Sequence, residues 1–239
     1  MITDKQVKEI AKFYQIDDFT VRREYLQLVF LSYFYQLKEA KNVFFKGGTA
    51  IRLLFDSTRF SEDLDFSTTY NKSQIKKIIK IVEKSINQEL PKLNIYLLYS
   101  GKEGERYRIR YQSDEMKYPL VIRLDFHRVK KVDNIAVSPL LTRFPIVIFP
   151  LISHLSKEEI LSEKILALTT RAKGRDFFDV WYLLEKGVIL SKKINKKAVL
   201  NKIRSCPQIV LDRDLSQFLP KSQRRIIGIL KERLEGHFK

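Results

Sequence analysis

The sequence predicts an α+β fold in which a mixed β-sheet with flanking helices is followed by an all-helical C-terminal domain. Short apolar runs with strand character alternate with helical patterns up to about residue 150, and no convincing strand follows. The chain has 239 residues, of which 44% are hydrophobic, so it can bury the core of one large domain or two small ones. We therefore expect an α/β domain with N-terminal helices at 1–153 and a basic helical domain at 154–239.

The expected elements follow from two kinds of spacing. Apolar residues that recur every three or four positions predict helices, and bounded runs rich in β-branched and aromatic residues predict strands. The expected helices are 4–15, 18–40, 49–55, 73–90, 156–172, 175–186, 195–204 and 221–235. The expected strands are 43–45, 63–67, 94–100, 105–112, 118–127 and 144–150.

Composition excludes several classes of protein. Aromatic residues make up 12% of the chain, unlike the aromatic-poor composition of disordered proteins. The single Cys206 excludes an intramolecular disulfide and a Cys-rich zinc site, and the three histidines are scattered. No signal peptide opens the sequence, and its longest apolar runs fall far short of the ~18 residues of a membrane span. We expect a soluble, cytoplasmic protein with no membrane partner.

Basic side chains are in large excess. Lys and Arg number 45 against 28 Asp and Glu, which gives a formal net charge of +17. Residues 191–239 hold 13 Lys and Arg but 4 Asp and Glu, so over half of the excess lies in the helical tail. This clustering favours a polyanionic partner, RNA first, over a uniformly solvated surface. The alternative, in which lysine is merely a solubilising residue, stays open.

Residues 105–112 combine arginines with aromatic residues. Strand alternation places Arg106, Arg108 and Arg110 on one face, and Tyr107 and Tyr111 on the other. If the aromatic face is core, the arginine face is left for phosphates of a triphosphate or of RNA. A solvated outer face of the sheet is an equal alternative.

A glycine turn and an acidic pair form the most informative stretch. Gly47 and Gly48 precede a helical pattern, so backbone N–H groups and the positive helix end can face a phosphate. Asp63 and Asp65 are two apart in a strand, so both carboxylates point to one face. Such a pair suits a hard divalent cation like Mg²⁺, which also binds substrate phosphates. Each motif alone is common, but together they indicate a nucleoside triphosphate with its metal.

Asp125 offers a third carboxylate. In its strand Ile122 and Leu124 belong to the apolar face, so Asp125 shares the other face with Arg123. Asp125 could complete a three-carboxylate cage for two metal ions. The alternative is that it simply pairs with Arg123 or Arg110 across the sheet.

A later helical pattern carries a second charged group. Lys164 lies near the edge of an apolar face, where its ammonium could neutralise a triphosphate, although an arbitrary Lys is usually a snorkelling surface residue. Asp176 and Asp179 share one helical face. Arg175 and Asp179 are spaced for an ion pair, which favours a structural Asp179. Asp176 is the better candidate for orienting Lys164 or the nucleotide.

Taken together, these motifs resemble the nucleotidyltransferase-type toxins of the abortive-infection AbiEii family. The resemblance spans 40–190 and rests on Gly47-Gly48-Thr49, Arg59-x-Ser61-x-Asp63-Leu64-Asp65, Glu163-Lys164, Arg171 and Arg175-Asp176-Phe177-Phe178-Asp179. It implies a nucleotidyltransferase-like core that binds Mg²⁺ and a nucleotide, a following helical domain, and a toxin–antitoxin context with a cognate antitoxin. Related transferases usually place Ser directly after the first Gly of the turn, whereas Gly48 stands there in this sequence.

The hypothesis that results is a Mg²⁺-dependent nucleotidyltransferase that transfers NMP from an NTP to RNA, for example the 3′ end of tRNA, and releases pyrophosphate. The expected catalytic residues are Asp63, Asp65, Asp125, Lys164 and Asp176, of which the first three would hold two Mg²⁺ ions. The expected nucleotide-binding residues are Lys46, Gly47, Gly48, Thr49, Arg59, Ser61 and Lys164. Two alternatives stay open: transfer to a protein or small-molecule acceptor, and a non-catalytic RNA-binding module on the same fold.

Overall fold

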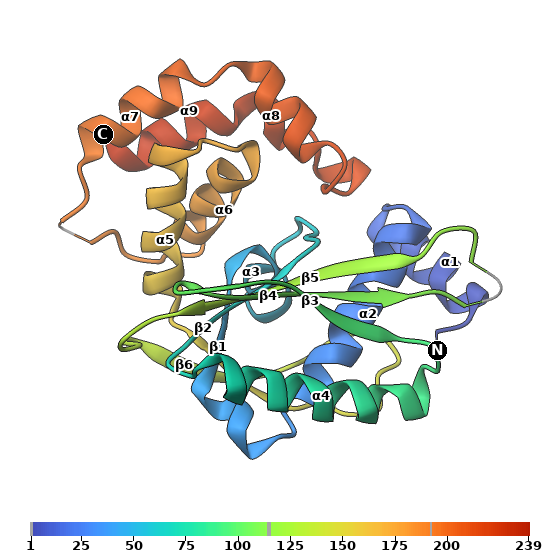
Figure 1. Ribbon diagram of the computed structural model, residues 1–239. Helices are drawn as coiled ribbons and strands as arrows, with labels where there is room; N and C mark the ends of the chain where they lie inside the picture. Colours follow the sequence, from blue (N-terminus) through green and yellow to red (C-terminus); the bar gives the residue numbers. More distant parts are fainter. Residues whose placement is uncertain (1, 114–115, 192) are drawn as a thin grey trace. The chain divides into compact units, whose positions relative to one another are not determined.

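The computed structural model describes residues 2–113, 116–191 and 193–239, which form two compact units. Unit 1 comprises the chain up to Asp56 together with Phe60–Leu155, and unit 2 comprises Ser57–Arg59 together with Ser156–Lys239. Unit 1 contains a mixed sheet with flanking helices and unit 2 is helical, so the predicted α+β class is confirmed (Figure 1). In the part of the chain that the structure describes, no helix is both long and apolar enough to cross a membrane.

The sheet of unit 1 contains seven strands within the described residues. They are β1 (Val43–Lys46), β2 (Leu64–Thr68), β3 (Asn94–Gly101), β4 (Gly104–Tyr111), β5 (Leu120–Arg128), β6 (Ile135–Pro139) and β7 (Leu151–Leu155). Their order across the sheet is β3-β4-β5-β2-β1-β7-β6. The β2–β5 and β1–β7 pairs are parallel and the other pairs are antiparallel. The strands that carry the predicted acidic residues, β2 and β5, are therefore direct neighbours near the middle of the sheet.

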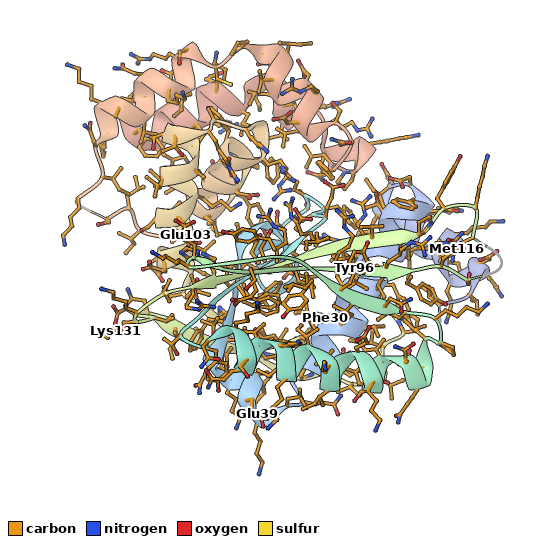
Figure 2. All side chains as sticks on the ribbon, in the orientation of Figure 1. Phe30, Glu39, Tyr96, Glu103, Met116 and Lys131 are labelled. Carbon is orange, nitrogen blue, oxygen red and sulfur yellow. The ribbon has the colours of Figure 1, made fainter. Side chains whose placement is uncertain are left out.

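Four α-helices and a 3-10 helix accompany the described strands of unit 1. They are α1 (Asp4–Tyr14), α2 (Asp18–Phe34), the 3-10 helix η1 (Lys38–Asn42), α3 (Gly47–Leu54) and α4 (Lys72–Glu89). Helices α2 and α4 pack on each other and against β5 and β3, and both lie on one face of the sheet (Figure 1). Figure 2 labels Phe30 of α2 between the sheet and α4, where its ring contacts Phe34 and Phe66. The core of unit 1 therefore lies on this face of the sheet, and the opposite face of the paired strands β2 and β5 is left for polar side chains.

Unit 2 contains five α-helices in its described residues. They are α5 (Lys157–Thr170), α6 (Gly174–Glu185), α7 (Lys196–Ser205), α8 (Gln208–Leu215) and α9 (Ile226–Phe238). Helix α6 packs against α5, α8 and α9 and supplies the fully buried Phe177. Helix α8 was not predicted from the sequence, because it has only two turns and buries only Leu211 and Leu215 of its apolar residues.

Three sequence-based assignments differ from the structure, and one of them is the helix predicted at 221–235, since α9 begins at Ile226 and ends at Phe238. No strand forms in the described stretch 144–150, and the chain instead builds β6 and β7 on either side of it. Pro145 cannot donate to a sheet ladder, and Val147 is exposed rather than part of a core face. The helix predicted at 18–40 ends at Phe34, because the polar segment that follows continues as η1 without an apolar stripe.

Candidate active site

One row of polar side chains crosses the sheet of unit 1. Directly paired residues in neighbouring strands project to the same face, so backbone register identifies the members of the row. From β1 to β3, they are Lys46, Asp65, Asp125, Arg106 and Tyr99. These side chains help line a cavity of about 310 Å³, together with Glu103, Gly104 and His127. We call this set of five residues the cross-strand row.

Asp63 lies just before β2 and adjoins the row. Leu64 and Phe66 are fully buried, while Asp63 and Asp65 are half-buried, which is the alternation expected of a strand with one core face. The two carboxylates therefore project from the face opposite the core.

Two arginines bind the carboxylates. Arg123 pairs with Asp63, and its Nε lies 2.9 Å from Oδ2 of Asp125. Arg106 pairs with Asp125 from the other side. The hydrogen bond from Arg106 to Asp125 raises the pKa of the Arg106 guanidinium, and the charges of Asp63 and Asp65 raise it further. The charges of Asp63, Asp65 and Asp125 therefore all act on the guanidinium of Arg106, so the three carboxylates lie close to one another.

Gly47 brings the start of α3 against Asp65. Its φ is +78°, and a Cβ built there would lie 2.2 Å from Oδ2 of Asp65. A side chain at this position is therefore excluded both by backbone strain and by contact with the carboxylate. Lys46 is the N-cap of α3 and its side chain makes no capping hydrogen bond. The first N–H groups of the helix thus begin next to Asp65, in an arrangement that suits an anionic group.

Thr49 and Ser61 hold the backbone around the acidic pair. Thr49 is buried and its hydroxyl donates a hydrogen bond to the carbonyl of Asp63. The carbonyl of Ser61 accepts a hydrogen bond of 3.1 Å from Nε2 of Gln27 in α2. Both residues were predicted to bind nucleotide, and what the structure shows for each is a contact that fixes the segment leading into β2.

The remaining predicted residues meet in unit 2, in a buried ion-pair cluster. Arg59 donates two hydrogen bonds to the carboxylate of Asp179, at 2.8 and 2.9 Å. Nζ of Lys164 lies 2.7 Å from Asp179 and 3.7 Å from Asp176. Arg171 binds Asp176 with two hydrogen bonds of 2.8 Å. We call these five residues the buried cluster.

Four members of the buried cluster are almost inaccessible to water, whereas the side chain of Arg171 is 53% exposed. Asp176 and Asp179 are 0% exposed, Arg59 is 2% exposed and Lys164 is 9% exposed. Burial by itself raises the pKa of Asp179, but the positive charges of Arg59 and Lys164 outweigh it and lower that pKa below its ordinary value. Asp179 is therefore held as a charged carboxylate within the fold.

The predicted ion pair between Arg175 and Asp179 is wrong. Asp179 points into the interior of unit 2 and binds Arg59 and Lys164, whereas the guanidinium of Arg175 lies 5.7 Å from the ring centroid of Phe218. A structural role for Asp179 was expected, and these contacts give it one through different partners.

The carboxylates suit a hard divalent cation in their chemistry. Asp65 and Asp125 are direct register partners, and Asp63 is two residues from Asp65, so three oxygen-donor side chains are available on one face. Arg106 forms an ion pair with Asp125, and Arg123 forms one with Asp63. Within residues 2–113, 116–191 and 193–239, no three His, Cys, Asp or Glu side chains are gathered into a group that could hold a metal ion. The sheet thus supplies suitable donors, of which Asp63 and Asp125 are paired with arginine.

His127 and Tyr99 line the cavity and were not assigned to the site from the sequence. His127 could have been found, because alternation places it on the face of Asp125. Tyr99 could not, since a register irregularity between Leu97 and Tyr99 breaks the period that would orient it.

Comparison with known proteins gives one family. The model of the family described as "Nucleotidyl transferase AbiEii toxin, Type IV TA system" matches residues 29–233. No curated protein matches at a significant level. Among solved structures, MenT4, a nucleotidyltransferase toxin from Mycobacterium tuberculosis, is 18% identical with a TM-score of 0.65, covering 100% of this chain and 89% of that chain. JHP933 from Helicobacter pylori is 17% identical with a TM-score of 0.57, covering 93% and 94%. At these identities the solved structures show a shared fold.

Proposed function

The chain belongs to the AbiEii family of nucleotidyltransferase toxins of type IV toxin–antitoxin systems, and we propose that it transfers a nucleoside monophosphate to an RNA acceptor such as the 3′ end of a tRNA. Family membership implies a nucleoside triphosphate as substrate and an antitoxin as partner. The observation that carries the proposal is the cross-strand row, which brings Asp65 and Asp125 together beside the glycine turn at the start of α3.

The proposed reaction is an in-line displacement at phosphorus. The oxygen of an acceptor hydroxyl forms a bond to the α-phosphorus of the triphosphate, and the bond from that phosphorus to the bridging oxygen of the β-phosphate breaks. Pyrophosphate leaves, and the proton of the hydroxyl is released. In such a transfer the bonds form and break mainly within the substrates. The protein therefore contributes to catalysis mostly by positioning the substrates and neutralising their charge.

The start of α3 is the proposed site for the triphosphate. The N–H groups that follow Gly47 and Gly48, and the ammonium of Lys46, would bind phosphate oxygens. Thr49 supports this site by tying α3 to the backbone of Asp63. The roles of Lys164 and Asp176 in nucleotide binding stay part of the proposal on sequence grounds.

Asp63, Asp65 and Asp125 are the residues that would hold Mg²⁺. When bound, the ion would neutralise phosphate charge and lower the pKa of the attacking hydroxyl. In the structure Arg106 and Arg123 pair with Asp63 and Asp125, which orients these two carboxylates on one face of the sheet. These guanidinium groups are about half exposed, so each ion pair can be exchanged at little cost in stability.

The experiment that tests this function is label transfer. The protein is incubated with total RNA, Mg²⁺ and each α-³²P-labelled nucleoside triphosphate in turn. We expect the wild type to label RNA with at least one nucleotide, and chelation of the metal to abolish labelling. Asp65→Asn should not label, whereas Asp133→Asn, an exposed carboxylate of unit 1 that pairs only with Lys131 among the described contacts, should label normally. Labelling by Asp65→Asn at the wild-type rate would refute the assignment.

A further inference from the structure

Strand β4 carries a ladder of arginines on the face that bears the cross-strand row. Tyr107, Ile109 and Tyr111 are buried on the core face, and Arg106, Arg108 and Arg110 alternate with them. Successive arginines are two residues apart, which is about 7 Å along a strand. This repeat is close to the distance between neighbouring phosphates of an extended nucleic-acid strand.

The arginines of the ladder differ in whether a carboxylate neutralises their charge. Arg106 pairs with Asp125, at the end that belongs to the cross-strand row. Arg108 contacts the ring of Tyr96 and Arg110 donates a hydrogen bond of 3.1 Å to Gln112, and within the described ranges neither forms an ion pair with a carboxylate. Positive charge without a carboxylate partner therefore begins one step from the acidic residues and continues away from them.

Two exposed tyrosines accompany the ladder. Register pairs Tyr99 with Arg106 and Tyr96 with Arg108, and these rings are 56% and 39% exposed. The guanidinium carbon of Arg108 lies 6.0 Å from the ring centroid of Tyr96, which Figure 2 labels on the sheet. Exposed aromatic rings beside unpaired cations are the elements that single-stranded nucleic acids use, because bases stack on the rings while phosphates bind the cations. An acidic protein partner would need the cations but not the rings.

The ladder also has a direction. One end is the cavity of the cross-strand row, where the acceptor hydroxyl must react. The other end is a second cavity of about 470 Å³, whose lining includes Lys92, Asn94 and Arg110. A strand of about three nucleotides in extended form would match the distance from Arg106 to Arg110, which is about 14 Å.

From these observations we infer that the exposed face of β3 and β4 binds the single-stranded 3′ end of the acceptor RNA. The terminal nucleotide lies at Arg106 and Tyr99, the preceding phosphates lie on Arg108 and Arg110, and a base stacks on Tyr96. This inference rests on the proposed function, because it takes the acceptor to be RNA. It adds that the protein recognises an unpaired 3′ tail rather than a duplex end.

The test measures binding separately from transfer. A fluorescent single-stranded RNA of about 10 nucleotides is titrated with protein in the absence of nucleotide, and fluorescence anisotropy is followed at several salt concentrations. In the variant Arg108→Gln/Arg110→Gln we expect affinity to fall at least tenfold, and the slope of log K against log salt to fall by about 1.4, since each phosphate contact on a single strand contributes about 0.7. Tyr96→Leu should lower affinity about tenfold and leave the slope unchanged. A blunt RNA duplex should bind all variants alike.

The matched control removes the same charge from another surface of unit 1. Lys76→Gln/Lys80→Gln lies on the exposed side of α4 and should bind the single strand within about twofold of the wild type. All variants are first compared by circular dichroism and melting temperature. Equal loss in the control variant would mean that binding follows net charge, and would overturn the inference.

The outcomes separate this inference from the proposed function. Wild-type binding and RNA labelling that are unchanged in Arg108→Gln/Arg110→Gln would overturn the binding face and leave the transferase function standing. Loss of binding in that variant, with no labelling of RNA by the wild type, would support the face and refute the proposed reaction. Competition by polyglutamate as effective as by RNA, with no effect of Tyr96→Leu, would overturn the inference in favour of an acidic protein partner.

Discussion

The cross-strand row of unit 1 and the buried cluster of unit 2 use the same chemistry in different surroundings. In both, aspartates bind arginine or lysine. The side chains of Asp125 in the row and of the adjoining Asp63 are 24% exposed, whereas those of Asp176 and Asp179 are wholly buried. Exposed pairs contribute little to stability and can exchange partners, whereas a buried pair is costly to break. Burial, more than residue type, therefore decides how strongly the stability of the fold depends on an aspartate.

Substitutions in the buried cluster should destabilise the protein strongly. Asp179→Ala should lower the free energy of unfolding by about 3–5 kcal/mol, because it removes the buried carboxylate that both Arg59 and Lys164 bind. Urea denaturation of the wild type and the variant measures this. Asp212→Ala, an exposed carboxylate of α8 in the same unit, serves as the control and should change stability by less than about 0.5 kcal/mol. Equal effects of the two substitutions would remove the contrast between the two regions.

The cross-strand row should show the opposite behaviour. Asp65→Asn should reduce label transfer at least about 100-fold, as expected when a group that stabilises developing charge is removed. Its melting temperature should stay close to that of the wild type, since Asp65 is only half-buried. A variant that loses activity only because it unfolds would contradict this prediction, and a melting curve recorded on the same sample distinguishes the two cases.

Gly47→Ala tests the close contact between the glycine turn and Asp65. The substitution combines strain at φ +78° with a Cβ that would collide with Asp65, so we expect it to cost about 1–3 kcal/mol and to reduce label transfer. Gly187→Ala provides the matched control, because Gly187 has φ +77° but no atom within 4 Å of its added Cβ. The excess cost at Gly47 in urea denaturation reports the collision alone. No excess would mean that Asp65 does not depend on the glycine.

Acid should act on the buried cluster through Asp179. Its folded-state pKa is lowered, so the stability it contributes is present above its ordinary pKa and is lost as pH falls through the folded-state pKa. The difference in unfolding free energy between the wild type and Asp179→Asn should therefore be largest near neutrality and shrink in strong acid. Urea denaturation across a pH series measures it. A difference that grows toward low pH would have the wrong sign.

Loss of the Thr49 hydroxyl should have a modest effect on stability. Thr49→Val removes the hydroxyl that binds the carbonyl of Asp63, and should cost about 1–2 kcal/mol. Thr49→Ser should restore most of this, because it keeps the hydroxyl. Thr69→Val, at an exposed position just after β2, should be near neutral. If Thr49→Ser were as destabilising as Thr49→Val, packing of the methyl group rather than the hydrogen bond would explain the loss.

Local patterns predicted the fold class and most elements, because their signal lies within single segments. The alternation around Asp63 and Asp125 is such a signal, and it correctly assigned buried and exposed faces to β2 and β5. The stretch 144–150 was misread, since its apolar run suggested a strand although prolines interrupt the ladder.

Partners distant in sequence could not be predicted. Arg59 and Asp179 are 120 residues apart, and no spacing rule joins them, so the nearby Arg175 was chosen instead. Arg123 was expected as one possible partner of Asp125, but its second bond, to Asp63, depends on the parallel pairing of β2 with β5. Such contacts follow from the arrangement of strands and helices, which the sequence determines only through the whole fold.

The helical unit is not continuous in the chain, since it includes Ser57–Arg59 from the segment between α3 and β2. A recombinant fragment that starts at Ser156 would retain every helix of that unit and still lack the guanidinium that neutralises Asp179. The carboxylate would then sit in an apolar interior with Lys164 alone. Supplying the missing arginine on a short N-terminal extension is therefore a rational first step for anyone who wishes to study the helices in isolation.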